Sequence, residues 1–169
     1  MQSAPGGVIP AYIAFGANLG EPVETLRAAA VALGRLAGVE LIAGSPIYRT
    51  RPIGPPGQPD YANAVARVGT TLAAEALLDV LHAVEAEFGR VRDLRWGPRT
   101  LDLDLIWYEG NERADEHLTL PHPRAHEREF VLRPLVDLDP GLVLRGRRAG
   151  DWLAGLDPQG VEATGVALM

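Results

Sequence analysis

The sequence predicts an α+β fold in which helices pack on a mainly antiparallel sheet. Apolar runs typical of strands alternate along the 169 residues with segments whose apolar residues recur at helical spacing. Several links between these segments are short enough for hairpins, which favours antiparallel pairing. The length suits one domain with a full core, so we expect residues 1–169 to form a single domain.

In the first half of the chain, strand-like segments surround one helix. The apolar run 12–15 ends at a glycine and predicts a buried strand. Pro22 suits the first turn of a helix, and Gly38 is placed to end it. Apolar residues recur at helical spacing between them, at positions 23, 26, 30, 33 and 37. Further strands are predicted at residues 39–42, 45–50 and 61–68.

A long loop separates the last two of these strands. Residues 51–60 contain four prolines and two glycines, which exclude a helix or a central strand. Ten such residues exceed most connections between strands, and this length favours a binding role. In the strand that follows, Tyr61 and Asn63 share one face because side chains alternate.

The second half predicts one long helix, a strand and a broken helical stretch. Apolar residues at 77, 81, 84 and 88 form a single stripe that ends at Gly89. Glu85 lies at the edge of this stripe, where it is either a rim glutamate or bonded to a partner. Residues 100–108 and 118–120 predict strands, and a broken helical stretch follows to Asp137. From Arg145 onward the chain is rich in glycine and indicates no element.

Two carboxylates stand two residues apart in the strand at residues 100–108. Asp102 and Asp104 alternate with leucines at 101, 103 and 105, so both acids share one face. Their backbones are roughly 6.5 Å apart, which lets their oxygens converge on hard cations such as Mg2+. The alternative is the solvated face of a half-buried sheet.

The segment before this strand is rich in arginine and favours a functional site. Arg90, Arg92, Arg95 and Arg99 lie within ten residues, against one acid. Carboxylates that hold Mg2+ beside guanidinium groups that neutralise phosphate oxygens suit a metal-bound polyphosphate.

Composition excludes several other classes of function. Cysteine is absent, which excludes disulfides and thiolate catalysis. All 16 cationic residues are arginine, so neither a P-loop lysine nor a protein-kinase lysine is available. The net charge of −6 argues against a nucleic-acid partner. The uncharged start lacks a basic region, and no stretch is long enough to span a bilayer, so we expect a cytoplasmic protein without membrane contact. We also expect a monomer.

Several motifs together resemble the 6-hydroxymethyl-7,8-dihydropterin pyrophosphokinase family of folate biosynthesis. They occur in order at residues 12–20, 48–50, 58–63, 89–92, 95–105 and 120–123. The similarity extends from about Tyr12 to Pro140. One departure is Ala17, which stands where the family usually has serine. Another is His117, at a position where relatives often have arginine.

The resemblance implies a ferredoxin-like core and transfer of pyrophosphate from ATP to the hydroxymethyl group of the pterin, which releases AMP. It implies that Asp102 and Asp104 hold two Mg2+ ions and that Arg95 and Arg99 act in catalysis. Trp96 would close over the site as part of a movable lid.

The resemblance also assigns residues to the two substrates. The expected ATP-binding residues are Glu85, Arg92, Arg95, Trp96, Arg99, Leu105, Thr119, His122 and Arg128. The expected pterin-binding residues are Thr50, Ile53, Tyr61, Asn63, Trp96 and Phe130, with Tyr61 and Phe130 on the two faces of the ring. Two alternatives remain open at this point: a nucleotide-sugar transferase with the same Asp-x-Asp pair, and a non-catalytic ferredoxin-like binding module.

Overall fold

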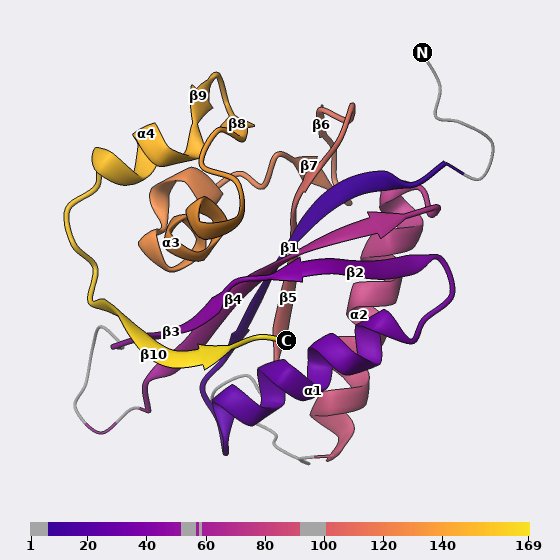
Figure 1. Cartoon of the computed structure of the whole chain (residues 1–169). Coiled ribbons are helices and arrows are strands. Elements are labelled where there is room, and N and C mark those ends of the chain that lie inside the picture. The colour runs from indigo at the N-terminus through magenta and orange to yellow at the C-terminus, as the bar shows by residue number, and fades with distance from the viewer. Residues whose placement is uncertain (1–6, 52–56, 58, 92–100) are drawn as a thin grey trace.

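One antiparallel sheet organises the structure, a computed structural model that describes residues 7–51, 57, 59–91 and 101–169 (Figure 1). The sheet has six strands: β1 (Ile9–Ala17), β2 (Val39–Gly44), β3 (Pro46–Thr50), β4 (Tyr61–Thr70), β5 (Asp102–Tyr108) and β10 (Val161–Ala167). The helices are α1 (Pro22–Gly34), α2 (Ala74–Val91), α3 (Glu129–Leu138) and α4 (Ala149–Ala154), with a 3-10 turn η1 (Ala125–Glu127) before α3. Two short ribbons complete the described elements: β6 (Arg113–Ala114) with β7 (Thr119–Leu120), and β8 (Val143–Leu144) with β9 (Arg147–Arg148).

The strands follow the order β10-β3-β4-β1-β5, and β2 also pairs with β4. All of these pairings are antiparallel. β2 and β3 pair with successive parts of β4. Ser45 lies between β2 and β3, and its backbone N–H donates to the carbonyl of Val65 on β4. The prediction of a mixed fold with a mainly antiparallel sheet is therefore confirmed.

The two faces of the sheet carry separate hydrophobic cores (Figure 1). On one face, α1 and α2 bury leucines against Ile13 and Phe15 of β1. On the other face, α3 and α4 pack against Tyr12 of β1, Val65 of β4 and Ile106 of β5. Within the described part of the chain, no helix is both long and apolar enough to cross a membrane.

Two helix ends differ from the sequence prediction. The helix expected to reach Ala37 ends at Gly34, because Leu33 is its last inward side chain and Leu36 is exposed. The chain then turns into β2 through Gly38, whose φ of +85° suits glycine. In contrast, α2 extends two residues beyond Gly89, to Val91. Differences of this size are common at frayed helix ends.

The chain beyond Arg145 forms three elements that the sequence pattern did not predict: β9, α4 and β10. α4 buries Ala149 in the second core, and β10 pairs with β3 as an edge strand. The side chains of β10 show no continuous apolar face, so alternation gives no signal there. Backbone pairing and a hydrogen bond of 2.6 Å from the Thr164 hydroxyl to the carbonyl of Ile47 hold β10 on the sheet.

Two tyrosines fasten the end of α3 to the sheet. The hydroxyl of Tyr12 donates to a carboxylate oxygen of Asp139 at 2.9 Å, and that of Tyr48 donates to Asp137. Burial, together with the neighbouring carboxylate, raises the pKa of Tyr12 to about 12 and that of Tyr48 to about 12. Both phenols can donate these bonds only while they are protonated.

We expect the free energy of unfolding to fall as the pH rises from about 10 to about 12. Tyrosine in the unfolded chain ionises near pH 10, whereas Tyr12 and Tyr48 in the folded chain ionise only near pH 12. Because the chain has no lysine or cysteine, few other side chains titrate in this window. Urea unfolding at several pH values should show a shallower decline for Tyr12→Phe than for the unsubstituted protein; parallel declines would contradict the assignment.

Candidate active site

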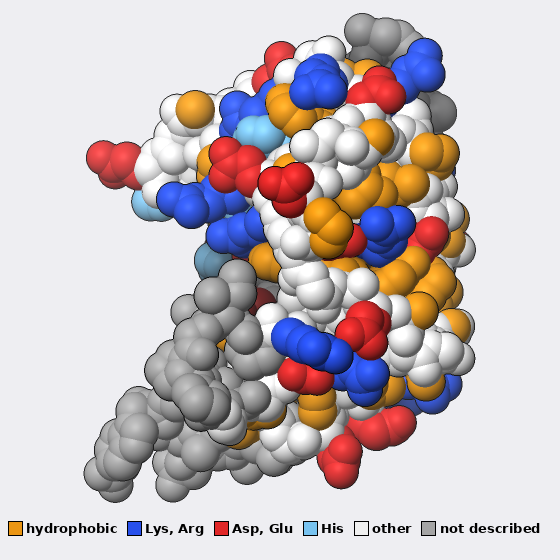
Figure 2. Space-filling model, turned by 90° about the vertical axis from the view of Figure 1, so that its left-hand side faces the viewer, with side chains coloured by type: hydrophobic (Ala, Val, Ile, Leu, Met, Phe, Trp, Pro, Cys, Tyr) orange, Lys and Arg blue, Asp and Glu red, His pale blue; other side chains and the backbone are white. Residues whose placement is uncertain are grey.

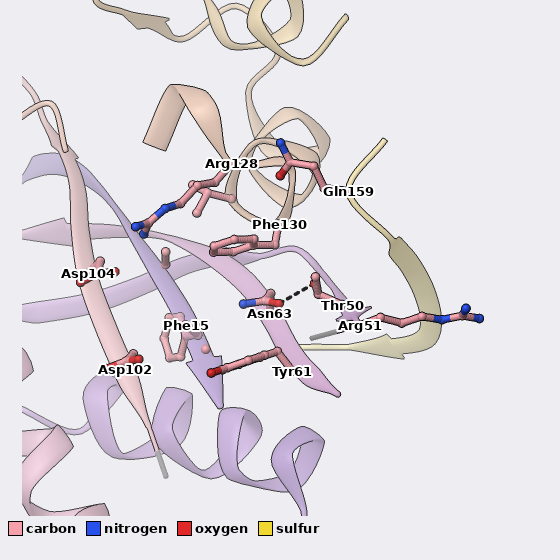
Figure 3. A pocket seen from close by; sticks show the side chains of 13 residues that line it. Phe15, Thr50, Arg51, Tyr61, Asn63, Asp102, Asp104, Arg128, Phe130 and Gln159 are labelled. Atoms are coloured by element: carbon pink, nitrogen blue, oxygen red, sulfur yellow. Dashed lines mark hydrogen bonds between the residues drawn. The ribbon is translucent and has the colours of Figure 1, made fainter. Parts of the chain in front are cut away.

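The second face of the sheet is only partly covered by α3 and α4, and a cavity of about 460 Å³ opens beside them. Strands β1, β3, β4 and β5 form its floor, and the beginning of α3 forms one wall (Figure 3). Thirteen residues line the cavity: Ala14, Phe15, Gly16, Thr50, Arg51, Tyr61, Asn63, Asp102, Asp104, Arg128, Phe130, Val131 and Gln159. In the space-filling view, blue arginine and pale-blue histidine side chains gather beside a recess (Figure 2).

Asp102 and Asp104 both reach the cavity from β5 (Figure 3). The leucines at 101, 103 and 105 point to the opposite face and are buried in the first core. The predicted separation of leucines and aspartates onto two faces is thus found in the structure. Both aspartates are half-buried, so their carboxylates can meet a ligand without being fully removed from water.

Glu85 of α2 holds the backbone of β5 between the two aspartates. Its Oε2 accepts a hydrogen bond of 2.7 Å from the backbone N–H of Leu103. This interaction fixes the strand at the point from which both carboxylates project. The structure therefore shows Glu85 bonded to a partner, the second of the two roles considered for it from the sequence.

A polar pair lies on the floor of the cavity, on β3 and β4. The hydroxyl of Thr50 donates to the side-chain oxygen of Asn63 at 2.8 Å, and both residues are buried (Figure 3). This bond orients the Asn63 amide so that its NH2 group remains available as a donor. Gly16 passes close beside it, since a Cβ there would lie 3.2 Å from Nδ2 of Asn63.

Two aromatic rings border this polar pair. Tyr61 extends from β4 and Phe130 from α3, on opposite sides of Asn63 in Figure 3. The guanidinium carbon of Arg128 lies 5.6 Å from the centroid of the Phe130 ring. Flat apolar rings around an oriented amide suit a planar ligand with a hydrogen-bonding edge.

His122 lies between β7 and η1, near the aspartate side of the site. Its backbone N–H donates to the carbonyl of Ile106 at 2.9 Å, and its Nδ1 accepts from the backbone N–H of Arg124 at 3.1 Å. Burial lowers the pKa of His122, Asp104 opposes this effect, and Arg128, Arg145 and Arg124 reinforce it. A neutral ring with Nδ1 as acceptor carries its proton on Nε2 and can donate there.

The remaining expected site residues divide into three groups. Thr119 is half-buried on β7, whereas Leu105 is buried in the first core and is not among the residues that line the cavity. Five expected residues lie outside the described part of the chain: Ile53, Arg92, Arg95, Trp96 and Arg99. Sequence reasoning missed Gln159, which reaches the cavity from the segment before β10.

The side chains that could hold a metal ion are the two aspartates. In the described residues, no group of three or more histidine, cysteine, aspartate or glutamate side chains gathers around one point. Mg2+ suits such a site, because it commonly takes one or two protein carboxylates and completes its shell with water and phosphate oxygens. The donor set therefore fits Mg2+ that enters with a polyphosphate.

An α+β sheet that presents two carboxylates to an aromatic-walled cavity suits an enzyme of metal-assisted phosphoryl transfer. The chain belongs to the 7,8-dihydro-6-hydroxymethylpterin-pyrophosphokinase (HPPK) family, whose model matches residues 12–140. This membership confirms the resemblance seen in the sequence motifs.

Proteins from several organisms share this similarity. A 2-amino-4-hydroxy-6-hydroxymethyldihydropteridine pyrophosphokinase of Haemophilus influenzae is 49% identical over 137 residues, which cover 81% of this chain and 86% of that protein. The protein of the same name from Pseudomonas aeruginosa is 48% identical over 153 residues, covering 89% and 94% of the two chains. The wild-type HPPK-DHPS of Plasmodium falciparum has a similar fold, with a TM-score of 0.66 at 12% identity over 87% of this chain. This chain spans 44% of that longer protein.

We expect Glu85→Ala to destabilise the protein. The substitution leaves the backbone N–H of Leu103 without its charged acceptor, which should lower the free energy of unfolding by about 1–3 kcal/mol. Chemical denaturation measures this change. Glu87→Ala on the exposed side of the same helix is the control and should stay within about 0.5 kcal/mol of the unsubstituted protein. Equal stability of all three proteins would mean that Glu85 does not anchor β5.

Proposed function

We propose that the cavity is the active site of a pyrophosphokinase and that its two ends bind ATP and the pterin. The reaction is transfer of pyrophosphate from ATP to 6-hydroxymethyl-7,8-dihydropterin in folate biosynthesis, with release of AMP. One observation carries the assignment of the site: paired carboxylates and an aromatic pocket with an oriented amide open onto the same cavity. Membership of the HPPK family favours this reaction over the two alternatives, a nucleotide-sugar transferase and a non-catalytic binding module.

At the carboxylate end, Asp102 and Asp104 would hold Mg2+ together with the triphosphate, and we propose two ions. Bound Mg2+ neutralises phosphate charge and favours attack by the substrate hydroxyl. The residues themselves bind and orient: Glu85 fixes the strand that carries both aspartates. Nε2 of neutral His122 donates to a phosphate oxygen, and Arg128 supplies positive charge from the start of α3. We assign Arg92, Arg95, Trp96, Arg99, Leu105 and Thr119 to the nucleotide as well.

At the aromatic end, Tyr61 and Phe130 would stack on the two faces of the pterin. Asn63, oriented by Thr50, would read the hydrogen-bonding edge of the ring. Ile53 and Trp96 complete the proposed pterin-binding set. Stacking supplies affinity, whereas the oriented amide discriminates against rings with a different pattern of donors and acceptors.

We also infer that the sheet and its first two helices form a ferredoxin-like core. The order β1, α1, β2 with β3, β4, α2, β5 along the chain supports this inference, since it is a β-α-β-β-α-β succession. The position of β1 between β4 and β5 agrees with it. Both hydrophobic cores share this one sheet, which supports a single domain.

We expect Asp102→Asn and Asp104→Asn each to lower turnover by about 100-fold or more, because an amide cannot balance the charge of a metal ion. Pterin-dependent formation of AMP over a series of Mg2+ concentrations is the measurement. Asp79→Asn, an exposed acid on α2, is the matched control and should retain full activity. Near-normal turnover of either variant at saturating Mg2+ would refute the metal assignment.

Loss of either aromatic ring should weaken pterin binding more than ATP binding. For Tyr61→Ala and Phe130→Ala we expect pterin affinity to fall about tenfold, which corresponds to about 1.4 kcal/mol of lost stacking. Calorimetric titration with each ligand measures both affinities. Tyr61→Phe keeps the ring and should bind pterin almost normally; equal weakening toward both ligands would instead indicate a collapsed core.

A further inference from the structure

Glu129 and Gln159 are joined by reciprocal hydrogen bonds at the edge of the cavity. The backbone N–H of Glu129 donates to Oε1 of Gln159 at 2.9 Å. In return, the backbone N–H of Gln159 donates to Oε1 of Glu129 at 2.7 Å. A third bond, 3.2 Å long, joins Nε2 of Gln159 to the carbonyl of Glu127. The start of α3 is thus held by a residue 30 positions away in the sequence.

Gln159 belongs to a connecting segment, residues 155–160, which we call the strap. At one end the strap contacts the beginning of α3, where Arg128 and Phe130 reach the cavity (Figure 3). At the other end, the carbonyl of Gly160 accepts from the backbone N–H of Arg51, and Val161 pairs with Thr50. The strap therefore joins the wall that carries Phe130 to the floor that carries Thr50.

The first turn of α3 depends on this external support. Pro134 lies inside the helix and has no N–H, so the carbonyl of Phe130 lacks its usual helical partner. The N-cap residue Arg128 makes no capping hydrogen bond with its side chain. The amide oxygen of Gln159 takes that role, because it accepts from the first N–H of the helix.

Burial makes this arrangement specific. Glu129 is only 6% exposed, and its other oxygen accepts from Arg133 at 3.1 Å. A buried carboxylate is destabilising unless it has hydrogen-bond partners. Displacement of the strap would remove the hydrogen bond that Oε1 of Glu129 accepts from the backbone N–H of Gln159. The far end of α3 is held separately by Tyr12 and Tyr48. Without the strap, α3 could pivot about that end and move Phe130.

We infer that Gln159 is a positioning residue for the pterin, because its bonds to Glu127 and Glu129 set the distance between Phe130 and the floor of the cavity. The inference rests on the proposed function, in which Phe130 stacks on the pterin. A ring stack tolerates little displacement, whereas the long side chain of Arg128 can still follow a phosphate group. The strap therefore acts mainly on pterin binding.

Gln159→Met tests this role, because methionine keeps the volume of the side chain but removes its hydrogen bonds. With Mg2+ and a non-hydrolysable ATP analogue present, pterin affinity should fall about fivefold. Affinity for the ATP analogue alone should stay within about twofold. Amide exchange at Glu129 should become faster, since its N–H loses the acceptor on Gln159.

Two further variants separate the positioning role from a general effect on folding. Glu129→Ala should weaken pterin binding as Gln159→Met does, whereas Glu129→Gln keeps an acceptor for the N–H of Gln159 and should restore most of the affinity. Glu162→Gln is the matched control: it removes the surface ion pairs of β10 with Arg49 and Arg51 but leaves the strap intact. This control should bind pterin normally.

These measurements distinguish failure of the proposed function from failure of the positioning role of Gln159. If the unsubstituted protein does not bind the pterin, the proposed function fails. If it binds and Gln159→Met binds equally well, the positioning role is refuted even where exchange at Glu129 changes. Parallel losses of affinity for both ligands would also refute it, because they would show a structural role alone.

Discussion

The alternation of side chains along β5 is the constraint on which the site depends. A strand sends successive residues to opposite faces, so the leucines that anchor β5 under α2 force the intervening aspartates into the cavity. Glu85 adds a second restraint at the backbone of Leu103. The hydrophobic core on the other side of the same strand thus holds both carboxylates in position.

Unequal coverage of the sheet leaves room for the cavity on one of its faces. α1 and α2 cover one face, whereas α3 and α4 pack only on the part of the other face around Tyr12, Val65 and Ile106. The uncovered floor combines small residues, such as Gly16, with the bonded Thr50 and Asn63. A helix held at both ends then forms the wall, so the cavity has firm borders without being closed.

Sequence reasoning succeeded where a pattern is local and periodic. The period of two placed Asp102 and Asp104 on one face, and it placed Tyr61 and Asn63 together on another strand. It failed for β10 and Gln159, because their roles arise from backbone pairing and from contacts with residues distant along the chain. No apolar pattern marks such contacts. The helix predicted to reach Ala37 ends at Gly34 for a related reason. Apolar residues continue at helical spacing in the sequence, but Leu33 is the last residue of α1 that packs in the core.

The late position of the strap in the sequence has a consequence for synthesis. A ribosome delivers the chain from its N-terminus, and every other cavity-lining residue precedes Gln159. A nascent chain that has emerged only through α3 already carries the aspartates, the aromatic rings and the polar floor. It still lacks the segment that fixes the first turn of that helix. The wall that carries Phe130 therefore gains its bonds to Gln159 only after residues 155–160 have been synthesised.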